Sequence, residues 1–150
     1  MRGYSVTGPS ASGTTLKTAA TIVSGTTVRP RLYEFEVSLV TAPNSTDQQL
    51  NYAVQRFTVA GTATAYTPLP LDPADVAAVA TAGVTHSAEP TYTAGGALTN
   101  QNINQRFKYR WVAAPGYEFM APATAANGIG LYNVAITAAA VMHGTLMFFE

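Results

Sequence analysis

The side chains that most often perform chemistry are few in this sequence and widely spaced. Its only two histidines, His86 and His143, are 57 positions apart, and neither has a second ligand at the spacing of a metal site. His86 lies in the polar segment THSAEP, where hydrogen bonding to the backbone is the ordinary role. Glu34 and Glu36 share one face of a predicted strand and could bind calcium, but a solvated face or ion pairs with arginines explain them more simply. We therefore predict no metal site.

Motifs for catalysis and cofactor binding are also missing. The segment Gly128-Ile129-Gly130 lacks the third glycine and the following helix of a dinucleotide site, and it indicates a turn or bulge that enters a strand. There is no phosphate-binding loop and no Gly-x-Ser-x-Gly elbow. The sequence therefore predicts a protein without a cofactor that is not an enzyme.

Basic and aromatic side chains alternate in the segment RFKYRW, residues 106–111. Rings that stack on bases and cations that follow phosphates could together bind single-stranded nucleic acid. In a strand, however, successive side chains point to opposite faces, so the aromatic rings and the basic side chains do not form one mixed surface. We assign the aromatic face to the core. The formal net charge of zero also argues against a nucleic-acid or membrane surface.

The composition indicates a surface suited to being covered by another protein. Charged residues make up 11% of the chain, against about a quarter in ordinary soluble domains. Alanine and threonine together fill 47 of the 150 positions. We interpret the low charge as burial of part of the exterior in an assembly. The alternative is a neutral β protein that stays soluble through hydroxyls and amides. There is no cysteine, and no window approaches the ~18 apolar residues of a membrane span.

Hydrophobic periodicity predicts mainly strands. Period-two alternation is clearest at 33–39, where Tyr33, Phe35, Val37 and Leu39 share one face, and a second strand at 52–59 is expected beside it. Further strands are predicted at 106–111, 117–120, 130–136 and 141–149. One short helix is predicted at 72–82, because Asp72 can cap it, Pro73 suits its first position and Gly83 can end it. We place this helix as a plug across one end of the β structure.

Residues 1–28 are predicted to form a flexible N-terminal arm, and residues 29–150 a single β-sandwich domain. The arm is rich in Gly, Ser, Thr and Ala and has few large apolar side chains. Only 20–24 could pair as a short strand. The expected fold class is all-β, a jelly-roll-like sandwich or barrel with one short helix and an extended N-terminal arm.

Four segments of the sequence carry a resemblance to a known class of proteins, namely 70–75 (PLDPAD), 89–93 (EPTYT), 104–116 (NQRFKYRWVAAPG) and 122–131 (PATAANGIGL). In these segments the sequence resembles small structural proteins encoded by tailed bacteriophages. The likeness covers roughly residues 30–150 and is weakest in the arm. In length and architecture the chain is similar to head decoration proteins, also called cement proteins, several of which are jelly-roll trimers on the capsid exterior.

The resemblance implies a virion protein on the capsid exterior, made in the bacterial host cytoplasm, with the major capsid protein as its partner. It also implies a homotrimer that binds the assembled shell better than free capsomers and so stabilises the shell. The arm would reach neighbouring capsomers and become ordered on binding. The candidate capsid contacts in this arm are Arg2, Tyr4, Leu16, Lys17, Ile22 and Arg29.

A second function stays open from sequence, namely a receptor- or glycan-binding module of a phage tail or head fibre. In that case exposed loops would hold the ligand, and Tyr66, Tyr92 or Tyr117 would stack on a sugar ring.

Overall fold

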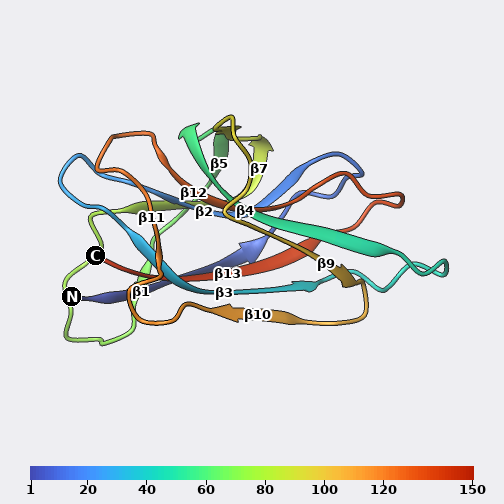
Figure 1. The fold of residues 1–150 in the computed structure, drawn as a ribbon, viewed down its shortest axis with the longest axis horizontal. Helices are drawn as coiled ribbons and strands as arrows, with labels where there is room; N and C mark the ends of the chain where they lie inside the picture. Colours follow the sequence, from blue (N-terminus) through green and yellow to red (C-terminus); the bar gives the residue numbers. More distant parts are fainter.

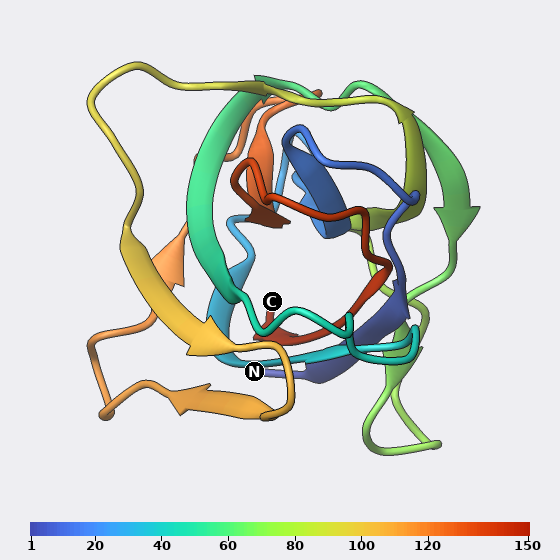
Figure 2. The ribbon, with the colours of Figure 1, turned by 90° about the vertical axis from the view of Figure 1, so that its right-hand side faces the viewer.

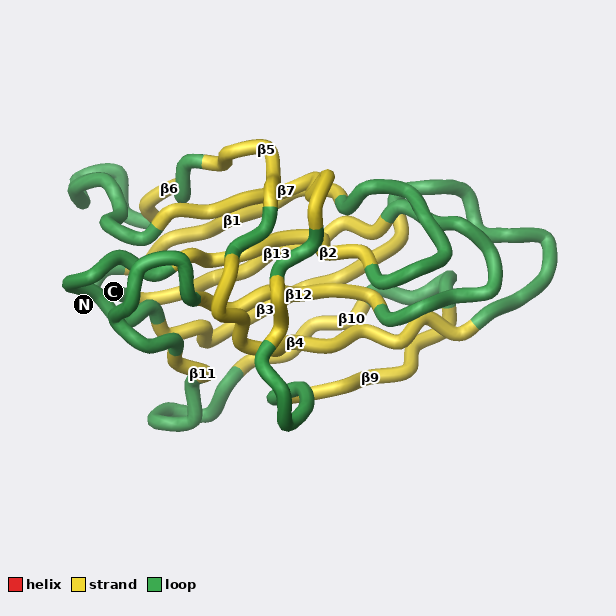
Figure 3. The backbone as a smooth tube through the Cα atoms, turned by 90° about the horizontal axis from the view of Figure 1, so that it is seen from above, coloured by secondary structure: helices red, strands yellow, loops and turns green.

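The computed structural model describes residues 1–150 as two antiparallel β-sheets without any helix (Figures 1 and 3). The strands are β1 (Gly3–Pro9), β2 (Lys17–Val23), β3 (Arg31–Leu39), β4 (Gln49–Val59), β5 (Thr62–Tyr66), β6 (Leu69–Pro70), β7 (Thr81–Ala88), β8 (Thr91–Tyr92), β9 (Thr99–Asn104), β10 (Tyr109–Val112), β11 (Phe119–Met120), β12 (Gly128–Asn133) and β13 (Met142–Phe149). The prediction of an all-β fold is confirmed. Accordingly, no helix of membrane-spanning length and hydrophobicity is found.

Each sheet has strands from both ends of the chain at its centre. Sheet I has the order β10-β3-β13-β1-β6, with β11 also paired to β3. Sheet II has the order β5-β7-β2-β12-β4-β8, with β9 also paired to β4. Strands β1 and β13 pair along their whole length, from Gly3 opposite Phe149 to Pro9 opposite His143. Figure 2, a view along the strands, shows the two sheets curving around a common interior.

The core fills the space between the two sheets. Strand β13 alternates strictly, so that Leu146 and Phe148 are fully buried while Met147 and Phe149 are only half-buried. Sheet II contributes Ile129 and Leu131 to the same core. This period-two pattern is what a strand produces when one of its faces packs on a second sheet.

Strand β3 confirms the predicted alternation at two positions and corrects it at Tyr33. Phe35 and Val37 are buried in the core. A register shift against β13 places an extra residue at Tyr33, so this ring leaves the core face and stacks on Phe149 at 4.2 Å. Strand β4 covers the predicted strand at 52–59, but it lies in sheet II and is not a neighbour of β3.

The predicted helix at 72–82 is wrong, because residues 81–88 form strand β7 and residues 71–80 form turns. Asp72 does cap the segment, since its Oδ1 accepts a hydrogen bond from the Ala74 amide at 2.9 Å, but only one turn follows. The Glu150 carboxylate then accepts hydrogen bonds from the amides of Val79 and Ala80, which are therefore not paired within a helix. A helix of this length has little stability of its own, and strand pairing replaces it.

The predicted flexible arm over residues 1–28 is also wrong, because β1 and β2 are inner strands of the two sheets. Tyr4 and Val6 point into the core, while Ser5 and Thr7 point outwards. Small and polar residues between the inward side chains look like a linker in the sequence, but the backbone of β1 is paired to β13 throughout. Backbone pairing and two deeply buried side chains are sufficient to order this segment.

Replacing Tyr4 tests whether β1 belongs to the folded core. Tyr4 is fully buried, stacks on Phe148 with the ring centroids 5.6 Å apart, and donates a hydrogen bond to the Val76 carbonyl at 3.0 Å. We expect Tyr4→Ala to lower the free energy of unfolding by about 3–5 kcal/mol, measured by urea denaturation. Ser5→Ala, on the outward face of the same strand, is the control and changes stability by less than about 0.5 kcal/mol. Equal, small effects of both variants would show that β1 is a dispensable arm.

Candidate functional site

The outer faces of the two sheets differ, because sheet II is covered and sheet I is open. The segment 86–93 crosses the outer side of sheet II and is visible in yellow tones across the top of Figure 2. Its Tyr92 ring lies over β12, where a Cβ added to Gly130 would come within 2.5 Å of the Tyr92 hydroxyl. No comparable segment lies over the middle of sheet I. The outer face of sheet I is therefore a surface on which a ligand or partner could bind.

A buried polar cluster lies beneath the covering segment. The Tyr92 hydroxyl is 2.8 Å from Thr18 Oγ1, and Glu89 Oε2 accepts a hydrogen bond from the Thr18 amide at 2.9 Å. His86 is 1% exposed, with Nε2 3.4 Å from Thr21 Oγ1 and no partner for Nδ1. Burial lowers the pKa of His86 from its ordinary value of 6.5, while the Glu89 carboxylate opposes that shift. His86 therefore has a structural position and no access to solvent.

Ion pairs join β3 and the strand beside it on the outer face of sheet I. Arg110 Nε is 2.6 Å from Glu34 Oε1, and Lys108 Nζ is 2.6 Å from Glu36 Oε2. The hydrogen bond to Glu34 raises the pKa of Arg110. The interpretation of Glu34 and Glu36 as ion-pair partners is therefore confirmed.

The aromatic rings of residues 106–111 divide between the core and the surface. Tyr109 and Trp111 pack against the core, and Trp111 stacks on Phe119 at 4.5 Å. Phe107 is 68% exposed at the turn before β10. The assignment of the aromatic residues to the core is therefore confirmed for Tyr109 and Trp111 and wrong for Phe107.

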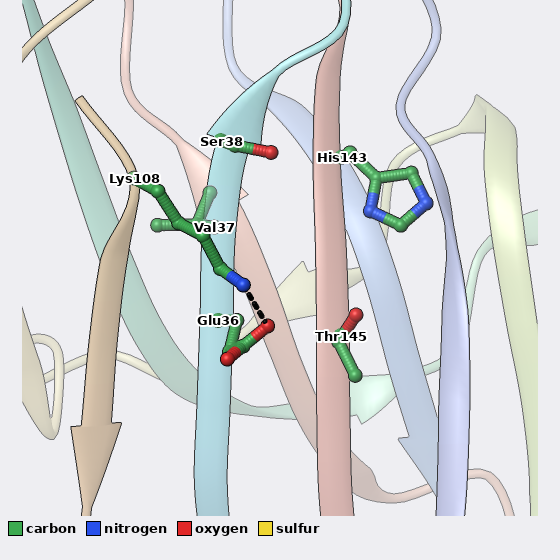
Figure 4. Close-up of a pocket in the computed structure, with 6 residues that line it drawn as sticks. All are labelled: Glu36, Val37, Ser38, Lys108, His143 and Thr145. Atoms are coloured by element: carbon green, nitrogen blue, oxygen red, sulfur yellow. Dashed lines mark ion pairs between the residues drawn. The ribbon is translucent and has the colours of Figure 1, made fainter.

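The open face of sheet I contains a polar pocket of about 200 Å³. Figure 4 shows its lining, formed by Glu36, Val37, Ser38, Lys108, His143 and Thr145. Strands β3 and β13 supply five of these residues, because their facing positions place Ser38 opposite His143 and Glu36 opposite Thr145. Thr7 on the neighbouring strand β1 lies beside the pocket, with Oγ1 3.0 Å from Thr145 Oγ1 and 3.4 Å from His143 Nε2.

The chemistry available in this pocket is hydrogen bonding. It offers a carboxylate, an ammonium, two hydroxyls and an imidazole. The charges of the carboxylate and the ammonium cancel in one ion pair. No group of three or more His, Asp or Glu side chains in the structure is placed to hold a metal ion. The arrangement can therefore orient a polar ligand through several directed contacts.

A second surface feature lies at the end of the sandwich where the two termini meet (Figure 1). The segment 69–80 turns around this end, and four of its aliphatic side chains are more than half exposed. They are Leu69, Leu71, Val76 and Val79, which we call the terminal apolar cluster. Arg2 and Asp75 form an ion pair of 3.3 Å beside it. Several exposed aliphatic side chains on one short segment, with an ion pair beside them, make this segment a candidate interaction surface.

The six candidate capsid contacts are not brought together on one surface. Tyr4 and Ile22 are fully buried in the core and cannot reach a partner. Lys17 forms an ion pair with Glu89, with its Nζ 3.5 Å from Oε1, and Leu16 is half-buried. Of the six, Arg2 and Arg29 are exposed, and Arg29 has no carboxylate within ion-pair distance.

Sequence reasoning missed both surface features for definite reasons. The valines of the terminal apolar cluster belonged to a predicted helix, whose apolar side would have packed on a sheet. The pocket joins Ser38, Lys108 and His143, which are distant in sequence, and only strand pairing brings them together. The alternation of β3 and the apolar run of β13 were visible in the sequence, but the register of the two strands was not.

No protein-family model, curated protein or solved structure matches this chain in the comparisons with known proteins. The resemblance to phage structural proteins therefore stays a prediction that rests on the sequence segments which carry it.

The ion pair between the exposed Arg110 and the buried Glu34 predicts a difference between two arginines. Glu34 is 7% exposed and would lose its charged partner in Arg110→Met, whereas Arg106 pairs with the exposed Asp47 only at 3.8 Å. We expect Arg110→Met to lower clearly the urea concentration at the midpoint of unfolding, because the largely desolvated Glu34 carboxylate is left without a charged partner. Arg106→Met is the matched control and leaves the midpoint nearly unchanged. Equal midpoints for the two variants would contradict the role assigned to Glu34.

The buried imidazole predicts a pH dependence of stability. Because the pKa of His86 is lower in the folded protein than its unfolded value of 6.5, the unfolded state binds more protons as the pH falls below 6.5. We therefore expect the free energy of unfolding to decrease as the pH falls below 6.5 and to be restored when the pH is raised above that value. His86→Gln should flatten this part of the stability profile, whereas His143→Gln should retain it. Identical slopes in the two variants, measured by urea denaturation between pH 4.5 and 7.5 (roughly the range in which histidines titrate), would exclude His86 as the source.

Proposed function

We propose that this chain is a structural protein of a tailed-bacteriophage virion, which binds the outer surface of the head as a homotrimer and stabilises the shell. The observation that carries the proposal is the terminal apolar cluster, four exposed aliphatic side chains on a chain with only 11% charged residues. Such a surface is favourable when another protein covers it and unfavourable in water. The partner that we propose for the assembled trimer is the major capsid protein.

We further propose that the sandwich is a jelly roll. In that fold eight strands pair as 1 with 8, 2 with 7, 3 with 6 and 4 with 5, and strands 8 and 7 also pair with 3 and 4. With β9 and β10 as the fifth and sixth strands, the pairings β1–β13, β2–β12, β3–β10, β4–β9, β13–β3 and β12–β4 are the same six. Strands β5 to β8 then form an insertion between β4 and β9. Viral capsid proteins and lectins both use this fold, so it is compatible with shell binding and with glycan binding alike.

The insertion carries the surface that we assign to self-association. Leu71 and Val76 are 51% and 58% exposed, and both lie on the segment that turns around the end of the sandwich. Leu71 also lies over Gly3 of β1, so the cluster continues onto the edge of sheet I. Burying each such half-exposed side chain in an interface contributes roughly 1 kcal/mol. A closed trimer would bury three copies of the cluster around its axis.

Stabilisation of the shell follows from linkage. A protein that binds the assembled shell more tightly than separate capsomers shifts the equilibrium towards the shell by mass action. Because the side chains of Tyr4 and Ile22 are buried in the core, this proposal does not include an arm that becomes ordered when it binds the shell. Arg29, exposed and without an ion-pair partner, remains available for an acidic side chain of the shell.

The second function, a receptor- or glycan-binding module of a tail or head fibre, is favoured by the polar pocket of sheet I. Of the three candidate tyrosines for sugar stacking, Tyr92 is unsuitable because its hydroxyl is bonded to Thr18 and its ring packs on Tyr132. Tyr117 is 77% exposed, and Tyr66 is half-buried. Neither residue lines the pocket.

The proposal is tested first by solution mass and then by binding to heads. We expect sedimentation equilibrium to give about three times the 15.7 kDa of one chain, and the double variant Leu71→Ser, Val76→Ser to give monomers. Val112→Ser removes an equally exposed valine outside the cluster and stays trimeric. The wild-type protein should co-sediment with expanded, undecorated phage heads and raise their disruption temperature.

A monomeric wild-type protein would contradict the homotrimer, and a trimer that does not bind heads would contradict the decoration role. If the double variant is still trimeric, the terminal apolar cluster is not the subunit interface. Unfolding curves of the variants establish that each is folded before its mass is interpreted.

A further inference from the structure

We propose that the pocket on the open face of sheet I is a binding site for a neutral saccharide. The pocket lies between strands β3 and β13 and the turn that precedes β10 (Figure 4). This inference does not depend on the decoration role, because the pocket and the terminal apolar cluster lie at opposite ends of sheet I. On β13, His143 is six residues from Phe149, which corresponds to about 20 Å along the strand.

Several polar groups in the pocket have hydrogen-bonding capacity that the protein does not use. Ser38 Oγ makes no hydrogen bond within the protein, and His143 bonds only through Nε2, to Thr7. Lys108 uses one of its donors on Glu36, and its side chain is 59% exposed. Thr145 is held by Thr7 at 3.0 Å. A ligand that enters the pocket therefore meets both donors and acceptors.

The charge of the pocket favours a neutral ligand. The charges of Lys108 and Glu36 cancel, because Lys108 Nζ lies 2.6 Å from Glu36 Oε2. Arg110 Nε also lies 3.8 Å from the other carboxylate oxygen of Glu36. An anion would face the Glu36 carboxylate, and a cation would face Lys108. One carboxylate and one imidazole are too few for a structural metal site. A molecule with many hydroxyl groups matches this mixture, because each hydroxyl both donates and accepts.

An apolar ligand does not fit the same pocket. Val37 is its only hydrophobic lining residue, and that side chain is 1% exposed because it points into the core. The pocket also lacks an aromatic ring on which a sugar could stack. Affinity for a single sugar is therefore low, with a Kd on the order of 1–10 mM. Several pockets in one oligomer would bind a polysaccharide more tightly through multivalency.

The test is an NMR titration of the isolated, isotope-labelled protein with glucose, galactose, mannose, rhamnose and N-acetylglucosamine, each to about 50 mM. We expect at least one sugar to give saturable amide shifts that are centred on Ser38, Lys108, His143 and Thr145. Inorganic phosphate serves as the anionic probe and should give none. Absence of saturable shifts with every sugar, saturable shifts centred elsewhere, or saturable phosphate binding in the pocket would each overturn the proposal.

Matched variants separate a specific site from weak surface contact. Ser38→Ala and Lys108→Met each remove polar groups that face the pocket while keeping most of the side-chain volume, and each should weaken binding by about threefold to tenfold. Arg106→Met removes an exposed cation outside the pocket and should leave the Kd unchanged. The amide spectrum of each variant reports whether it is folded. Unchanged affinity in both pocket variants would also overturn the proposal.

Discussion

The structure depends on the pairing of the two ends of the chain at the centre of both sheets. Strand β13 lies between β1 and β3, and β12 lies between β2 and β4. Neither sheet is complete until strands more than a hundred residues apart have met. The loss of chain entropy before such pairings form is large, so this topology is expected to fold slowly compared with a helical protein of the same size. The same pairing explains why the N-terminal residues, polar as they are, are essential to the core.

Close approach of the sheets sets further limits on the sequence at their centre. A Cβ added to Gly144 on β13 would lie 2.9 Å from the Ala19 Cβ and 3.0 Å from Leu131 Cδ2. A glycine and an alanine therefore face each other at a close contact between the sheets, and larger residues such as Phe35 and Phe148 fill the core elsewhere. The abundance of small residues, which looks like low complexity in the sequence, is at these positions a packing requirement.

The sequence predicted the type of secondary structure better than its arrangement. Period-two alternation identified β3, and a nearly continuous apolar run identified β13. It did not identify β1, where Tyr4 and Val6 alternate with Ser5 and Thr7 in a segment rich in glycine and serine. The helix prediction at 72–82 failed because capping residues specify only the first turn. Beyond that turn the chain contacts Glu150, 70 residues away from Ala80, whose carboxylate accepts a hydrogen bond from the Ala80 amide. Contacts of this range leave no local signal in a single sequence.

Sheet I separates two kinds of surface along the length of its strands. At the end where the termini lie, Phe149 stacks on Tyr33 and the terminal apolar cluster continues the apolar surface around the edge. At the other end, His143 and Ser38 face each other on β13 and β3 and lie in the polar pocket. A partner that covers the apolar end removes aliphatic side chains from water and leaves the polar pocket accessible. In the two proposals made above, the apolar end is the surface for self-association and the polar pocket is the saccharide site, and the antiparallel pairing of β3 with β13 fixes the distance between the two ends of the sheet.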